Sequence, residues 1–147
     1  MSNKYHSIES RVYYENTDAG GIVYHGQYLN FAERGRTELL RKIGYQSSDL
    51  TKEHGIMFVA RHVDINYYAP AFLDDLLEIR TSVAALKNSS FTMRQTLFRH
   101  KDALDKKSEE EKIAEVMVTL VCVKANGIKP LRVPDMLREK FTEYLER

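Results

Sequence analysis

The chain has 147 residues, of which 43% are apolar and 29% are charged, as in an ordinary soluble globular protein with one core. Its 22 Lys and Arg residues nearly balance 21 Asp and Glu residues. The net charge of +1 therefore excludes a strong overall electrostatic attraction to nucleic acid or to an anionic membrane. We therefore expect one domain over residues 1–147 and no nucleic-acid partner.

The cysteine and histidine residues give no pattern for a metal site, and the apolar runs are too short for a membrane span. The single cysteine, Cys122, lies in the apolar run 116–123, which is typical of a small buried hydrophobe, with a reactive thiol as the alternative. It cannot form a disulfide framework or a CxxC zinc site, and the five histidines lack metal-ligand spacing. No signal peptide and no run of about 18 apolar residues occurs. The sequence predicts a cytoplasmic protein with no membrane span, metal or cofactor.

The first third of the chain predicts a strand, a turn and a long helix. Residues 8–14 mix β-branched and aromatic side chains and predict the strand, and turn formers fill residues 16–21. Over residues 25–43 apolar side chains recur at steps of three and four, which predicts an amphipathic helix that Gly44 ends. A glycine inside this helix, Gly35, costs about 1 kcal/mol relative to alanine. We therefore expect another backbone to approach it closely, with the helix pressed onto a sheet.

The rest of the chain is dominated by strands. A short polar helix is expected from Ser47 or Ser48 to Glu53. Alternation of apolar and polar residues then predicts four strands, at residues 57–68, 76–86, 91–99 and 113–124. In the first of these, one face is expected to carry Val59, Val63, Ile65 and Tyr67.

The last third of the chain also contains a charged connection, a turn and a final helix. The charged run 101–112 is interpreted as a solvated connection. Asn126-Gly127 predicts a turn before a short strand, and Pro134 suits the first turn of a final helix. That helix is expected to bury Leu137, Phe141 and Leu145. Strands that follow one long helix favour an α+β class, with a curved antiparallel sheet wrapped around the helix.

The segment between the first strand and the long helix has the features of an active site. Asp18 lies in a turn with two adjacent glycines, which permit positive φ and a close approach to a ligand. The first N–H groups of the following helix form a site for negative charge. Acyl transfer to water needs a carboxylate beside such a site. The alternatives are that Asp18 makes an Asx-turn or a helix cap, that His25 is structural, and that Tyr14 packs within the strand.

Residues 13–25, followed by Tyr28-Leu29 and residues 31–38, resemble the 4-hydroxybenzoyl-CoA thioesterase group of hotdog proteins. Within that group the chain most resembles the acyl-CoA thioesterases associated with the Tol–Pal system. The likeness continues in order through residues 67–71, 74–79, 114–116 and 121–123 and Lys129-Pro130.

This resemblance implies a hotdog fold and the hydrolysis of an acyl-CoA to a free acid and CoA. By similarity, Asp18 is the catalytic aspartate, acting as general base on water or as nucleophile on the thioester carbonyl. The backbone N–H of His25 would polarise the thioester oxygen, and its side chain would orient water or substrate. Tyr14 falls where the family has a tyrosine at the site. The sequence departs from the family at Asn16, where an acidic residue is frequent, and at Phe72, where a basic residue is common.

The resemblance also implies a homodimer or homotetramer with its sites between subunits. Gly26 is expected beside the substrate. Phe58, Val59 and Arg61 are expected to line an acyl channel of the neighbouring subunit, and a core strand is the alternative for that segment. Three other functions remain open: a thioesterase acting on acyl-carrier protein, a hotdog hydratase, and a non-catalytic acyl-binding adaptor of a cell-envelope complex. We expect Asp18→Asn to leave such an adaptor's partner binding intact.

Overall fold

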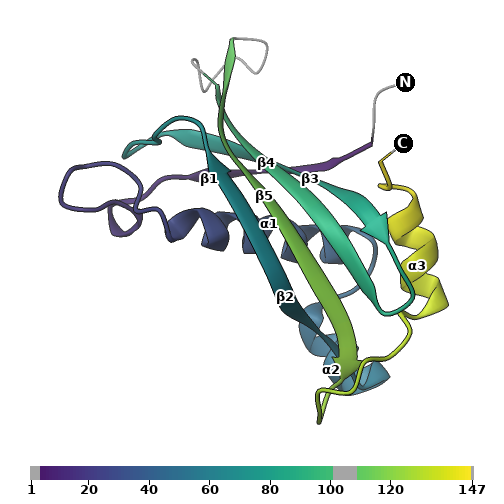
Figure 1. Ribbon diagram of the computed structural model, residues 1–147. Coiled ribbons are helices and arrows are strands. Elements are labelled where there is room, and N and C mark those ends of the chain that lie inside the picture. The colour runs from purple at the N-terminus through teal and green to yellow at the C-terminus, as the bar shows by residue number, and fades with distance from the viewer. Residues whose placement is uncertain (1–3, 101–108, 147) are drawn as a thin grey trace.

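The computed structural model describes residues 4–100 and 109–146. Five antiparallel strands form one sheet in the order β1-β3-β4-β5-β2. The strands are β1 (His6–Arg11), β2 (Ile56–Tyr67), β3 (Leu76–Leu86), β4 (Ser90–His100) and β5 (Glu110–Lys124). The helices are α1 (Gln27–Lys42), α2 (Ser47–His54) and α3 (Asp135–Thr142), with a 3-10 turn, η1, at Tyr14–Asn16. The long α1 crosses one face of the curved sheet (Figure 1), which confirms the predicted α+β architecture.

Gly35 lets α1 lie directly on the sheet. A Cβ atom added there would come within 2.8 Å of Ile79 Cγ2 and 2.9 Å of Gln95 Nε2. Real Cβ contacts are not that short, so only glycine permits this approach. The predicted close packing of helix on sheet is confirmed. The atoms that approach Gly35 belong to side chains of β3 and β4, however, and not to another backbone as predicted.

The core consists of two apolar clusters along α1. One surrounds the second half of the helix and includes Leu39, Phe91 and Phe141, and the other surrounds the first half and includes Phe31 and Ile79. Cys122 is fully buried in the first cluster, and burial raises the pKa of its thiol. Because the thiolate is the reactive form, this favours the prediction of a small buried hydrophobe.

The edge strand β2 differs from its predicted pattern. Its ladder with β5 shifts register between Ala60 and His62, so one extra residue lies opposite the partner strand. This bulge reverses the alternation. Val59 therefore does not share a face with Ile65, which packs against the core. Four apolar side chains along β2 are 40% to 49% exposed: Met57, Val59, Val63 and Tyr67.

Several predicted boundaries at the start of the chain move. The first strand ends at Arg11 and not at residue 14, because Arg11 pairs with Leu76, the first residue of β3. Helix α1 begins at Gln27 and not at residue 25, because the Gln27 N–H donates to the Tyr24 carbonyl and closes a turn first.

Boundaries in the second half also differ. Strand β5 begins at Glu110 and takes up the end of the charged run, of which residues 101–108 lie outside the described residues. After the Asn126-Gly127 turn, the predicted short strand is reduced to a single bridge between Val123 and Pro130. Helix α3 ends at Thr142, so Leu145 lies beyond it, where its backbone bridges to β3.

Candidate active site

The loop before α1 is anchored by a buried asparagine. Asn16 Oδ1 accepts the Tyr13 N–H at 2.8 Å, and Asn16 Nδ2 donates to Gln27 Oε1 at 3.0 Å. Only 4% of Asn16 is exposed. A carboxylate could accept the first bond but could not donate the second. The departure from the family pattern at this position therefore has a local role, because the amide ties the loop to the first turn of α1.

Asp18 lies in a tight turn within this loop, with its carboxylate exposed. Its Oδ1 accepts the Gly20 N–H at 2.8 Å, which is the Asx-turn considered as an alternative. Its backbone N–H donates to Ile22 and its carbonyl accepts from Gly21, which has a φ of 82°. Within the described residues Oδ2 accepts no hydrogen bond. The turn thus fixes one carboxylate oxygen and leaves the other accessible.

The amino end of α1 carries two unpaired backbone donors. Gly26 is the N-cap residue and no side chain caps the helix. Among residues 4–100 and 109–146, neither the His25 N–H nor the Gly26 N–H makes a hydrogen bond. Helix-terminal donors of this kind attract negative charge. Asp18, His25 and Gly26 are thereby placed in one loop at one end of α1.

Tyr67, at the end of β2, holds this helix terminus. Its hydroxyl donates to the His25 carbonyl at 3.0 Å, which fixes the peptide group that carries the Gly26 N–H. The Tyr67 ring packs edge-on against Tyr28, with 5.4 Å between the centroids. The imidazole of His25 is exposed and lies beside Tyr24, with 4.3 Å between the rings. Sequence reasoning included Tyr67 in the family resemblance but gave it no role.

Tyr14 differs most from its predicted setting. It begins the 3-10 turn η1 and does not continue the first strand. Its side chain is 81% exposed, so the alternative of a packing residue is wrong. Tyr14 shares the loop with Asp18, and its carbonyl accepts the Thr17 hydroxyl at 2.7 Å.

A cavity of about 460 Å³ lies further along α1, between that helix, α2 and the sheet. Its apolar wall includes Leu40, Phe58, Phe91, Met93, Leu120 and Phe141. Phe58 packs edge-on against Phe91 with ring centroids 5.0 Å apart. Tyr14, Asp18, His25 and Gly26 do not line this cavity. Neither do Val59, which is 42% exposed, nor the exposed Arg61.

The polar wall of the cavity includes a residue that sequence reasoning missed. Arg36 lines it and donates from Nη1 to Gln95 Oε1 at 2.8 Å. Burial lowers the pKa of Arg36, and the nearby charge of Glu33 partly offsets that effect. Two patterns in the sequence could have marked each residue as unusual, though not their contact: Arg36 falls between Ala32 and Leu40 at steps of four, and Gln95 falls on the inward face of its strand.

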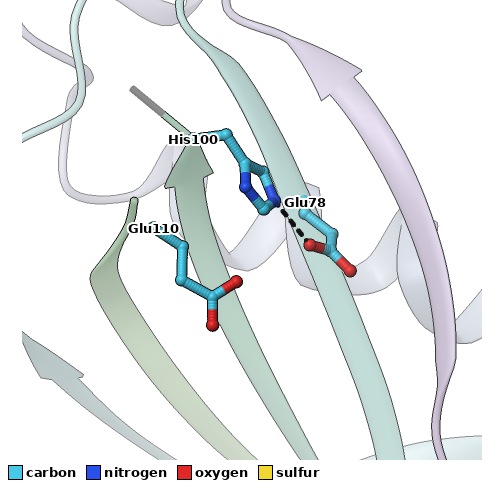
Figure 2. Close-up of side chains that lie close together, drawn as sticks. All are labelled: Glu78, His100 and Glu110. Carbon is cyan, nitrogen blue, oxygen red and sulfur yellow. Dashed lines mark hydrogen bonds and ion pairs between the residues drawn. The ribbon is translucent and has the colours of Figure 1, made fainter. Parts of the chain in front are cut away.

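Glu78, His100 and Glu110 converge on the sheet away from this loop, with ligand atoms within 4.8 Å of one another (Figure 2). His100 Nε2 lies 2.7 Å from Glu78, whose pKa falls to about 2 because hydrogen bonds from Arg80, Ser7 and His100 outweigh the effect of burial. Arg80 binds both carboxylates, Glu78 at 3.0 Å and Glu110 at 2.6 Å. A guanidinium at that position repels a cation, so the group is an ion-pair network.

A curved antiparallel sheet around one long helix, with a carboxylate loop at the amino end of that helix, defines a protein of the hotdog class. A family model described as thioesterase-like superfamily matches residues 12–141. Acyl-CoA thioesterase YbgC of Haemophilus influenzae is 38% identical over 135 residues, covering 92% of this chain and 93% of that protein.

Two solved structures agree with this relative. A probable thioesterase from Bartonella henselae is 35% identical and covers 89% of this chain and 100% of that one, with a TM-score of 0.77. A 4-hydroxybenzoyl-CoA thioesterase complexed with 4-hydroxybenzoyl-CoA is 18% identical and covers 91% of this chain and 96% of that one, with a TM-score of 0.82, and it supports the fold alone.

The chain belongs to the thioesterase-like superfamily, and its class is that of a thioester hydrolase. The resemblance to the 4-hydroxybenzoyl-CoA thioesterase group and the predicted hotdog fold are confirmed. In the described part of the chain, no helix has the length and apolar character needed to cross a bilayer.

Proposed function

We propose that the protein is a cytoplasmic acyl-CoA thioesterase, acting as one domain on acyl-CoA and releasing a free acid and CoA. The observation that carries this proposal is the pairing of an accessible carboxylate with two unpaired helix-terminal N–H groups in one loop. The thioester carbonyl binds at the amino end of α1, and Asp18 acts on it. The names of the relatives support the acyl-CoA substrate.

In this proposal Asp18 uses the oxygen that its turn leaves accessible. Because Oδ1 is held by the Gly20 N–H, the carboxylate has a fixed direction before substrate arrives. Oδ2 either takes a proton from water, which attacks the carbonyl, or attacks the carbonyl itself and forms an anhydride that water then cleaves. On both routes the C–S bond breaks and CoA leaves as the thiolate. A single turnover in isotope-labelled water separates the two, since only the nucleophilic route transfers label into the Asp18 carboxylate.

The His25 and Gly26 N–H groups stabilise the oxyanion that either route creates. Donors that are fixed beforehand need no reorganisation as the charge develops, which makes such contacts a large part of catalysis. Tyr67 supports them, because its hydroxyl polarises and orients the peptide group between His25 and Gly26. The exposed His25 imidazole orients water or substrate, and the exposed Tyr14 of the same loop contacts the bound thioester.

We also propose that the site is completed by a second copy of the chain. The outer edge of β2 has no partner strand among the described residues, and it exposes apolar side chains along its length. An unpaired, apolar edge of this kind favours pairing with another chain. If two β2 edges pair antiparallel about His62 and Val63, Phe58 of one copy lies beside Tyr67 of the other, whose hydroxyl binds its own His25 carbonyl.

In this proposed dimer, the remaining predicted substrate contacts, Phe58, Val59 and Arg61, lie near the subunit interface. Phe58 opens the cavity of one subunit toward the thioester held by the other, so the acyl group enters the cavity. Val59 and Arg61 are exposed on the paired edge, where they contact the neighbouring subunit and the CoA portion. The particle is a homodimer, or a homotetramer built from two such dimers.

The test is thiol release from a panel of short, long and aromatic acyl-CoAs by the purified protein. Turnover of any member supports the proposal and gives the substrate class. If no CoA ester is hydrolysed but the same acyl group on acyl-carrier protein is, the carrier-protein thioesterase is the correct function. If neither is hydrolysed and a cell-envelope complex retains the protein after Asp18→Asn, the adaptor function is correct.

A further inference from the structure

Arg36 is a cation without an anionic partner, set in the wall of the cavity. Its Nη1 donates to the neutral Gln95 amide at 2.8 Å, and within the described residues it forms no ion pair. Three arginines of the sheet, Arg80, Arg94 and Arg99, each bind two carboxylates. Arg36 differs from these three, because among the described residues its only hydrogen-bond partner is a neutral amide.

Gln95 holds the guanidinium in a fixed position. It is fully buried, and its Nε2 donates to the Ala32 carbonyl at 2.6 Å and to Thr81 Oγ1 at 3.0 Å. Because both bonds use the amide nitrogen, Oε1 must face Arg36. Gly35 allows this contact, since any larger residue there would displace Gln95 Nε2. The arginine is thus oriented from behind, as recognition residues are.

The remaining donors of Arg36 are unpartnered in the described part of the chain, and the residue lines the cavity. In residues 4–100 and 109–146, its Nε and Nη2 have no hydrogen-bond partner, and neither is among the fully buried unpartnered atoms. The residue itself lines the cavity. A guanidinium offers its N–H donors in a planar fork that matches a carboxylate. One edge of that fork is occupied by Gln95, and the rest is accessible to a ligand.

The other walls determine which ligand fits. Leu40, Phe91, Met93 and Phe141 are apolar and suit a hydrocarbon chain. A purely hydrocarbon acyl group that filled the cavity would remove water from Arg36 and supply no acceptor, which is costly for a charged group. A chain that ends in an anionic group meets both requirements, because its stem packs on the apolar wall and its end binds the guanidinium.

Among the described residues that line the cavity, Glu33 is the one carboxylate, and it opposes this arrangement. It lies one turn before Arg36 on α1, also lines the cavity and is exposed. Its charge acts on Arg36 through space, but the two side chains do not form an ion pair. Replacing it should therefore strengthen binding of an anionic group at Arg36.

We propose that Arg36 selects acyl thioesters whose acyl group carries a terminal carboxylate, that is, monothioesters of dicarboxylic acids. This inference rests on the proposed function, since it names the substrate class of that same site. Arg36 binds the distant carboxylate of the acyl group and takes no part in the chemistry at the thioester.

The experiment compares matched acyl-CoAs that differ only in the terminal group, hexanoyl-CoA and adipoyl-CoA first and then shorter and longer pairs. For the wild type, kcat/KM should be roughly ten- to a hundredfold higher for the dicarboxylic member, as for a hydrogen bond to a charged group. Arg36→Met should reverse that preference, mainly through KM, and Glu33→Gln should increase it. Arg34→Met is the matched control, because Arg34 lies on the same helix, is absent from the cavity lining, and is held by a hydrogen bond to Ser10 and by the Phe31 ring.

Each result bears on the inference. Equal use of both members by the wild type, at every length, would overturn it while leaving the proposed function intact. A preference for the dicarboxylic member that Arg36→Met retains would also overturn it. If Arg36→Met fails to fold, the wild-type ratio and the Glu33→Gln increase still decide. No turnover of any member would overturn the proposed function and this inference with it.

Discussion

Two regions of α1 differ in almost every physical respect. The loop at its amino end is exposed, rich in glycine and held by hydrogen bonds to backbone groups, with Asp18 and His25 open to solvent. The cavity beside the second half of the helix is lined by core side chains, with one oriented guanidinium at Arg36. In the proposed function, hydrolysis depends on fixed donors in the loop, and acyl recognition depends on how helix and sheet pack. We therefore expect that the two can be varied separately.

After loss of the Asp18 carboxylate itself, removing a backbone donor from the loop should lower kcat the most. Gly26→Pro deletes the Gly26 N–H, and the Gly26 φ of −70° suits proline. If that N–H binds the oxyanion, kcat should fall by about 10²–10³ relative to Gly26→Ala, which shares the added Cβ atom 3.0 Å from the Tyr24 ring. Gly26→Ala keeps the donor and serves as the control. Wild-type kcat in Gly26→Pro would rule out this contact.

Substituting Gly35, which lies behind the cavity, should lower the free energy of unfolding. Gly35→Ala places a Cβ atom 2.8 Å from Ile79 Cγ2, and overpacking of this kind costs about 1–3 kcal/mol. The better helix preference of alanine returns up to about 1 kcal/mol. Urea unfolding should therefore show a loss of about 1–2 kcal/mol. Gly127→Ala is the control, because nothing lies within 4 Å of its added Cβ. Unchanged stability in Gly35→Ala would contradict the close packing of α1.

Removing the hydroxyl of Tyr67 should lower kcat by a smaller factor. Tyr67→Phe removes the bond to the His25 carbonyl and keeps the ring against Tyr28. A loss of about 1 kcal/mol, typical of one hydrogen bond, corresponds to a roughly fivefold lower kcat. KM should not change, because the bond orients an oxyanion donor and not the bound acyl chain. Tyr68→Phe, at the exposed neighbouring position, is the control. A rise in KM at constant kcat would assign Tyr67 to ground-state binding instead.

The ion-pair network of Glu78, Arg80, His100 and Glu110 should not affect turnover or acyl recognition. It should affect only the stability of the fold in acid. Hydrogen bonds lower the pKa of Glu78 from 4.5 to about 2 in the folded state, despite burial. The folded protein therefore binds fewer protons than the unfolded chain in that range. The stabilisation is fully present above about pH 4.5 and is lost as the pH falls toward 2. Glu78→Gln should flatten this part of the stability curve, and the exposed Glu139→Gln should not.

The sequence predicts the loop better than the cavity for a physical reason. Asp18, the glycines and the helix start are contiguous, so a local motif contains the whole arrangement, and only its details differ, as at Tyr14. The strand pattern likewise predicts the sheet, apart from the bulge near Arg61, which reverses the face of Val59. A bulge adds one residue without a characteristic composition, so alternation alone does not reveal it.

The cavity depends on contacts between distant segments. Arg36 and Gln95 are 59 positions apart and meet only because Gly35 lets α1 lie against β4. Each residue looks unusual alone, as a charge or an amide on an apolar face. Their pairing requires the register of helix against sheet, which no local pattern contains. The same holds for Tyr67 and His25, which are 42 positions apart.

The most direct test of the account compares thiol release from acyl-CoA by the wild type, Asp18→Asn and Glu15→Gln. Glu15 is an exposed carboxylate of the same loop and controls for charge. We predict that kcat falls by about 10³ in Asp18→Asn, with folding intact, and stays at the wild-type value in Glu15→Gln. Turnover by Asp18→Asn at the wild-type rate would contradict the central claim that the Asp18 carboxylate drives hydrolysis.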